Sequence, residues 1–232
     1  MWNGKKKAVT FSLDDGVTQD IRVIEIMNKY GIKCTFNLNS AKLGELSGPW
    51  EVDGRVIVRQ LVDASAVKDI YAGHEVAVHT LTHPNLTTLN DETVIRQVDL
   101  DRILLSDLCG YPVIGMAYPC GGVNNDERVA GLIRENTPIQ YARTITPTHS
   151  FGLQKDSLLR FNPTFHWMDK KVGELVDKFL AMETDEPQLL YIWGHSYELD
   201  YSEERWVYFE ELCKKLAGRD DIFYGTNKEV LL

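Results

Sequence analysis

The chain has 232 residues, of which 44% are hydrophobic and 25% are charged, and its formal net charge is −9. This length suffices for one domain with a large buried core. The acidic net charge disfavours binding to nucleic acids and to anionic membranes. The one basic run, Lys5–Lys7, lies at the N-terminal edge, where a solvated chain end is expected and not a binding surface. No stretch approaches the 18 apolar residues of a membrane span, and the four cysteines, which lack CxxC spacing, predict reduced and mostly buried thiols.

Strand-like and helix-like segments alternate along the chain. In chain order, the predicted strands cover residues 7–16 (ending in a polar loop), 33–40, 74–80, 113–119, 139–145, 188–196 and 222–226, with an extended stretch at 158–167. The predicted helices cover residues 20–30, 55–72, 90–109, 125–136, 170–183 and 202–218, and residues 44–54 are predicted to be a loop. Asn90 and Gly110 provide start and stop signals for the longest helix.

This alternation is typical of βα units that build a parallel sheet. About seven strands fit a closed or nearly closed barrel better than an open sheet. No linker, repeat or low-complexity segment interrupts the pattern. We therefore expect an α/β protein with a distorted (β/α) barrel of about seven parallel strands, formed by one domain that spans residues 1–232.

Polar clusters follow five of the predicted strands. They are "LDDG" (13–16), "HTLTH" (79–83), "AYPCGG" (117–122), "YARTI" (141–145) and "WGHS" (193–196). In a βα barrel the carboxyl ends of the strands converge on one rim, where active sites are built. We therefore expect these clusters to lie close together.

Two adjacent carboxylates, Asp14 and Asp15, follow the first strand. Taken alone, "DDG" is compatible with a simple turn, because Asp-Gly is a common turn pair. However, neighbouring carboxylates repel each other unless a cation or a proton intervenes. A bound metal ion would relieve the repulsion and allow the two residues to take different roles.

His79 and His83 supply neutral nitrogens of the kind that zinc and similar divalent ions prefer. A helical turn after His79 would bring both imidazoles to one side. With one carboxylate they would form a set of two histidines and one carboxylate, which leaves coordination positions open for water and substrate. That pattern is typical of a catalytic ion.

The segments "TFSLDDG", "HTLTH", "AYPCGG" and "YIWGHS", in this order and spacing, resemble the successive motifs of the polysaccharide deacetylase family, carbohydrate esterase family four. The resemblance runs from about Val9 to about Ser196, and the first two motifs together are the most specific. It implies a distorted (β/α) barrel of about seven strands, in agreement with the alternation.

The resemblance also implies roles for individual residues. Asp14 would be the general base, and Asp15, His79 and His83 would be the ligands of a divalent ion, with zinc expected and cobalt, nickel or manganese as alternatives. His195 would be the general acid.

The fourth-strand motif would provide an oxyanion donor, the backbone N–H of Tyr118. The family usually places an arginine just before this element to orient the catalytic aspartate, but this chain has Ala117 there. Arg143, at the end of the next strand, is a candidate replacement, with a role in bracing a loop as the alternative.

Three further residues are candidates for substrate binding. Trp167 resembles the aromatic residue that walls the acetyl pocket, although core packing explains it equally well. Trp193 stands where the family more often has an aliphatic residue. His166 lies in the extended stretch and is a candidate for lining the cleft, although a hydrogen-bonded loop histidine is the simpler interpretation.

Together these features predict a metal-dependent hydrolase that removes acetyl groups from N-acetylated or O-acetylated sugars or oligosaccharides. One alternative is a small-molecule amide or ureide hydrolase of the same fold, and another is a catalytically silent glycan-binding domain. The apolar run "AVTFSL" of the first strand begins at Ala8, without room before it for an apolar targeting segment. We therefore expect a cytoplasmic protein, or a secreted one whose leader is absent from this sequence. The sequence does not predict an oligomeric state.

Overall fold

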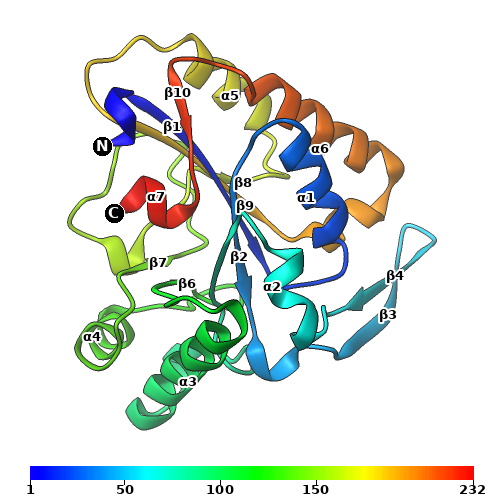
Figure 1. Cartoon of the computed structure of the whole chain (residues 1–232), viewed down its shortest axis with the longest axis vertical. Helices are drawn as coiled ribbons and strands as arrows, with labels where there is room; N and C mark the ends of the chain where they lie inside the picture. Colours follow the sequence, from blue (N-terminus) through cyan, green and yellow to red (C-terminus); the bar gives the residue numbers. More distant parts are fainter.

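The computed structural model describes all residues from 1 to 232, and its centre is a strongly curled parallel sheet (Figure 1). Its strands are β1 (Lys7–Asp14), β2 (Cys34–Leu38), β5 (Glu75–Val78), β6 (Gly115–Ala117), β7 (Tyr141–Arg143), β8 (Phe165–His166), β9 (Gln188–Gly194) and β10 (Ile222–Tyr224). The spatial order is β7-β6-β5-β2-β1-β9-β8, and β10 pairs with the first residues of β1. All of these pairings are parallel, which confirms the predicted α/β barrel architecture.

The two edges of the sheet approach each other through the extended segment 161–166. At one end of this segment, the Phe161 N–H donates to the Ala142 carbonyl of β7 at 2.9 Å. At the other end, the Thr164 N–H donates to the Tyr191 carbonyl of β9 at 2.8 Å. The sheet therefore curls into a nearly closed, distorted barrel.

Helices cover the outside of the barrel (Figure 1). They are α1 (Asp20–Lys29), α2 (Val67–Ile70), α3 (Asp91–Cys109), α4 (Glu127–Asn136), α5 (Val172–Ala181), α6 (Glu203–Leu216) and α7 (Asn227–Leu231). The predicted caps of α3 are confirmed. The Asn90 side chain accepts a hydrogen bond from the Thr93 N–H, and Gly110 ends the helix with a φ of 77°. None of the helices combines the length and apolar character needed to cross a bilayer.

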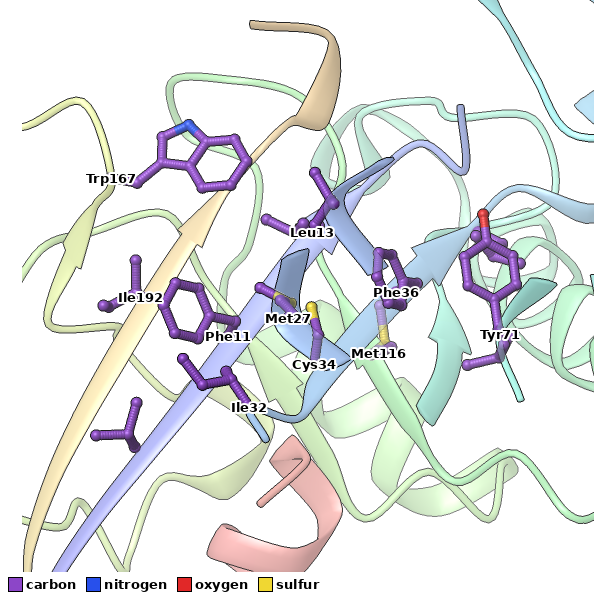
Figure 2. Close-up of a cluster of buried hydrophobic side chains, with 14 of the residues drawn as sticks. Phe11, Leu13, Met27, Ile32, Cys34, Phe36, Tyr71, Met116, Trp167 and Ile192 are labelled. Carbon is purple, nitrogen blue, oxygen red and sulfur yellow. The ribbon is translucent and has the colours of Figure 1, made fainter. Parts of the chain in front are cut away.

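The hydrophobic core lies between the outer face of the sheet and these helices. Phe11 of β1 packs edge-to-face against Phe209 of α6, and Phe36 of β2 packs against Tyr71 beside α2 (Figure 2). Because side chains alternate along a strand, the other face of β1 points into the barrel interior. That face carries Thr10, Ser12 and Asp14, all buried, so the interior is polar close to the rim.

The region between residues 44 and 72 differs from the prediction. Instead of a loop and a long helix, it forms an antiparallel hairpin of β3 (Leu46–Val52) and β4 (Arg55–Gln60), followed by a short 3₁₀ helix (Ala64–Ala66) and α2. The turn is Asp53-Gly54, both with positive φ, which suits a two-residue hairpin connection. The β-branched run Val56–Val58 favours a strand, so the helical interpretation of 55–72 was wrong.

The four cysteines are free thiols. Cys34, Cys109 and Cys213 are buried and Cys120 is half-buried, as the sequence predicted.

Candidate functional site

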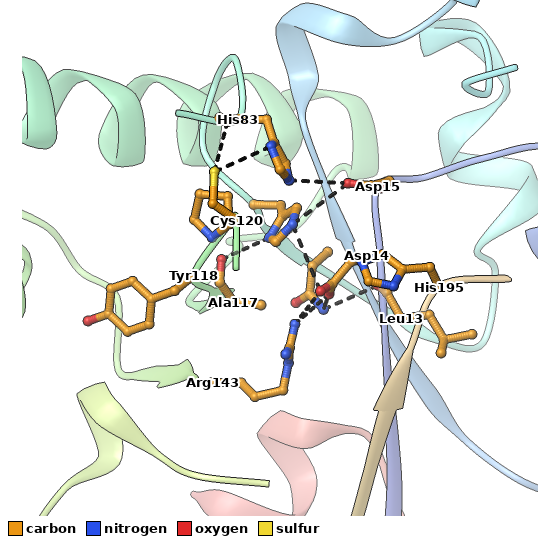
Figure 3. Close-up of polar contacts among 12 residues, drawn as sticks. Leu13, Asp14, Asp15, His83, Ala117, Tyr118, Cys120, Arg143 and His195 are labelled. Carbon is orange, nitrogen blue, oxygen red and sulfur yellow. Dashed lines mark hydrogen bonds and ion pairs between the residues drawn. The ribbon is translucent and has the colours of Figure 1, made fainter. Parts of the chain in front are cut away.

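The predicted polar clusters meet at the carboxyl end of the barrel (Figure 3). β1 delivers Asp14 and Asp15, the loop after β5 delivers His79 and His83, and β7 delivers Arg143. His195 follows β9 directly, and Cys120 follows β6. The parallel register of the strands brings these side chains together from positions far apart in the sequence.

Asp15, His79 and His83 form a compact group of metal-ligand type. One ligand atom from each lies within 4.8 Å of the others. The Asp15 Oδ1 atom is 3.8 Å from His79 Nε2 and 3.5 Å from His83 Nε2. The donor set of two imidazole nitrogens and one carboxylate oxygen is one that zinc favours in catalytic sites.

The surroundings of the two histidines fit a metal site. His79 Nδ1 lies 2.9 Å from the carbonyl oxygen of Ala117, to which it donates, so Nε2 is the ring nitrogen that faces Asp15. Burial, together with the nearby His79, lowers the pKa of His83 to about 4. His83 is therefore a neutral imidazole at physiological pH, as metal binding requires.

The loop between the two histidines is not the helical turn that the sequence analysis considered. Thr80 and His83 have positive φ values of 69° and 64°, and the two imidazoles converge through this irregular loop. Asn39 holds the loop, because its Nδ2 donates to the carbonyls of His79 at 2.5 Å and Thr80 at 2.7 Å. The rings of His79 and His83 are thus brought together by an irregular loop and not by a helical turn.

Asp14 makes a buried ion pair with Arg143. The Nη2 atom of Arg143 lies 2.6 Å and 2.5 Å from the two carboxylate oxygens, and Asn37 Nδ2 donates to Oδ1 at 2.8 Å. Burial alone would raise the pKa of Asp14, but the nearby positive charges, that of Arg143 above all, outweigh it and hold the pKa below its usual value. Arg143 thus contacts Asp14, the carboxylate that the resemblance implies an arginine at the position of Ala117 would orient.

The two adjacent aspartates take separate partners. Asp15 has a positive φ of 83°, which breaks the regular strand geometry at this point. Its Oδ2 accepts from Arg59 Nη1 at 3.0 Å, while its Oδ1 faces the histidines. Arg59 belongs to β4. The β3–β4 hairpin, which was not predicted from the sequence, therefore supplies a charged partner to Asp15.

The assignment of the Tyr118 N–H as oxyanion donor is contradicted. That N–H donates to the Arg143 carbonyl at 2.9 Å as part of the β6–β7 pairing, so it is not free to bind substrate. Pro119 has no N–H, and the next backbone donor on the loop is Cys120, whose N–H makes no hydrogen bond within the chain. The Cys120 thiol lies 3.8 Å from His83 Nδ1, beside the ligand group.

His195 is held by Glu198, a residue that the sequence analysis missed. His195 Nδ1 lies 3.3 Å from Glu198 Oε1, and Trp167 Nε1 donates to Oε2 at 2.7 Å. Burial lowers the pKa of His195, but the hydrogen bond to Glu198 and the charges of Asp14 and Asp15 more than compensate, and the pKa lies above 6.5. His195 is therefore stabilised in its protonated form.

His166 shares Glu198 with His195. The three residues also bring one ligand atom each within 4.8 Å of one another. However, the Met168 N–H donates to His166 Nδ1 at 3.2 Å, so the proton of the neutral ring is on Nε2, which lies 3.2 Å from Glu198 Oε2. A nitrogen that donates a hydrogen bond cannot bind a metal, and this group is a hydrogen-bond network centred on Glu198.

The two tryptophans differ in their surroundings. Trp167 is only 1% exposed and packs edge-to-face against Phe209, so the structure places it in the core, where its Nε1 orients Glu198. Gly194 makes room for it, because a Cβ at that position would lie 2.4 Å from the indole. Trp193 is half-buried, and the guanidinium of Arg143 lies 4.6 Å from its ring.

Comparisons with known proteins agree with this geometry. Residues 2–133 match the family model described as polysaccharide deacetylase. The fold resembles that of the deacetylase PplD from Streptococcus pyogenes, solved in complex with acetate, with a TM-score of 0.60, 18% identity, and coverage of 77% of this chain and 73% of that chain. It also resembles a pseudoenzyme of family CE4 from Bacillus anthracis, with a TM-score of 0.58, 17% identity, and coverage of 98% and 66%.

A polysaccharide deacetylase from Bacillus cereus is 21% identical, with a TM-score of 0.50 and coverage of 65% of this chain. The match spans only 44% of that longer protein. No curated protein sequence matched the chain.

Proposed function

The chain belongs to the polysaccharide deacetylase family, and from this premise we propose that it is a metal-dependent hydrolase that removes acetyl groups from N-acetylated carbohydrate. The observation that supports this most strongly is the grouping of Asp15, His79 and His83 beside the Asp14–Arg143 ion pair. We take residues 1–232 together as the catalytic domain.

Asp15, His79 and His83 would hold the divalent ion, and zinc suits their donor set best. When bound, such an ion supplies Lewis acidity, which polarises the acetyl carbonyl and acidifies water. Arg59 keeps Asp15 oriented with Oδ1 toward the histidines. All three proposed protein ligands are therefore side chains of this chain.

Asp14 and His195 would carry the proton transfers. Asp14 is ionised and fixed by Arg143, so it is ready to accept a proton from the attacking water. His195 keeps its Nδ1 on Glu198, which leaves Nε2 to donate a proton to the departing amine nitrogen. The Cys120 N–H is the backbone donor that would stabilise the oxyanion, an interaction typically worth about 3 kcal/mol.

An acetate-release screen tests the substrate class. The probes are N-acetylated oligosaccharides, O-acetylated glycans and small amides or ureides. The proposal predicts release from the N-acetylated sugars above all others. Hydrolysis of the small amides alone would favour the small-molecule alternative, and glycan binding without any acetate release would favour a silent domain like the pseudoenzyme relative.

The pH dependence of the Glu198→Gln variant tests the role of His195. Because the acid must be protonated, kcat/KM falls as the pH rises through the pKa of His195. The hydrogen bond to Glu198 and its negative charge raise that pKa, so removal of the charge should move the alkaline limb to lower pH. Glu211→Gln, which changes an exposed residue of α6, should leave the profile unchanged. A Glu198→Gln profile superimposable on that of the wild type would contradict this role.

A further inference from the structure

The barrel interior contains a buried hydrogen-bond network that starts at Asp14 and runs away from the rim. Its hub is Ser12 on β1, two residues before Asp14. Three side-chain nitrogens lie within hydrogen-bond distance of the Ser12 hydroxyl oxygen: Asn37 Nδ2 at 2.8 Å, Arg143 Nε at 3.2 Å and Asn227 Nδ2 at 3.1 Å. All four side chains are fully buried, so water does not compete for these bonds.

The guanidinium of Arg143 is held on each of its three sides. Nη2 binds Asp14, Nη1 donates to the Thr144 carbonyl at 3.1 Å, and Nε donates to Ser12. A planar guanidinium fixed at three points cannot rotate about its long axis. The position of Ser12 therefore determines the angle at which Arg143 meets the carboxylate of Asp14.

Ser12 is itself positioned from the far end of the chain. Asn227 is the first residue of α7, which packs against β1 (Figure 1). Besides its bond to Ser12, its Oδ1 accepts from the Thr10 hydroxyl at 2.9 Å, and its N–H donates to Thr35 Oγ1 at 2.8 Å. The two side-chain bonds fix the Asn227 amide with its NH₂ toward Ser12, and the backbone bond to Thr35 holds the first residue of α7 in place.

We propose that Ser12 and Asn227 are positioning residues for the Arg143–Asp14 pair, through which α7 takes part in orienting the general base. The proposal rests on the deacetylase function proposed above. Neither residue reaches the substrate side of the site, since each contacts Asp14 only through another residue. Small displacements of a reacting group can lower a rate by up to about a hundredfold, and an effect relayed through Ser12 and Arg143 should be smaller.

The test compares Asn227→Ala with Glu229→Ala. Both changes weaken α7, because Glu229 forms the capping box with Thr226, but Glu229 makes no contact with the network. We expect Asn227→Ala to lower kcat about tenfold, with KM and metal content unchanged and with a shifted NMR signal of the Arg143 Nε–H. Ser12→Ala, which removes one hydroxyl from a strand and is the milder change for folding, should give the same shift and a larger loss of kcat.

Several results would overturn the proposal. One is a kcat of folded Asn227→Ala and Ser12→Ala within twofold of the wild type. Another is an equal loss of kcat in Glu229→Ala, which would show that α7 affects the rate only through the stability of the fold. If the wild-type protein released no acetate at all, the proposed function would fail separately. The Arg143 Nε–H signal would still decide whether Asn227 orients Arg143, and an unchanged signal would refute it.

Discussion

The His79→Ala variant should fold but lose its bound metal and, with it, acetate release down to background. In the proposed metal site His79 is one of three ligands, and the hydrogen bond from its Nδ1 to Ala117 directs Nε2 toward Asp15. The other two ligands alone hold a divalent ion weakly, and without the ion neither the carbonyl nor the water is activated. Elemental analysis after dialysis, paired with an acetate assay, measures both losses.

His149→Ala is the matched control for this variant. His149 is also a partly buried histidine in contact with a carboxylate, because its Nε2 lies 2.7 Å from Asp169 Oδ2, but it is outside the ligand group. It should retain the metal and the activity. If His79→Ala kept a full equivalent of metal, the assignment of the ligand group would be wrong.

The Asp14→Asn variant should retain the metal but lower kcat by about a hundredfold or more. The amide has nearly the shape of the carboxylate, so it can still accept from Asn37, but it cannot accept a proton from water. It also leaves the buried Arg143 without its counter-ion, which should lower the melting temperature. Activity is therefore measured well below that temperature, with metal content determined on the same sample.

The comparison between the two variants separates binding from catalysis. His79→Ala loses metal and rate together, whereas Asp14→Asn loses rate alone. A metal-loaded Asp14→Asn protein that works within threefold of the wild-type rate would show that another group is the base.

The grouping of Asp15, His79 and His83 could be predicted from the sequence for a physical reason. In a parallel barrel all strands end at the same rim, so "LDDG" and "HTLTH" lie close together regardless of the conformation of the loops between them. The same reasoning placed Arg143 within reach of Asp14, although Ala117 occupies the usual arginine position. The details of the His79–His83 loop depend on Asn39 and on two positive φ values, which residue spacing does not reveal.

The missed residues depend on local geometry. The sequence predicts a helix at Arg59, because the apolar residues of 55–72 are compatible with a helical period, but the Asp53-Gly54 turn and the β-branched residues that follow it favour a hairpin. Glu198 is three residues from His195, and only the short 3₁₀ turn at Ser196–Tyr201 brings its carboxylate back to the imidazole. The wrong choice of Tyr118 arose because β6–β7 pairing extends one residue further than the motif suggested and uses its N–H.

The metal-dependent mechanism is tested most directly by acetate release from an N-acetylated oligosaccharide, measured on one protein sample in three states: with one equivalent of zinc, after chelation, and after zinc is returned. We expect turnover with zinc, none after chelation, and recovery that saturates at one equivalent per chain. Turnover that is unaffected by chelation, or a fully zinc-loaded protein that binds the oligosaccharide and releases no acetate, would contradict it.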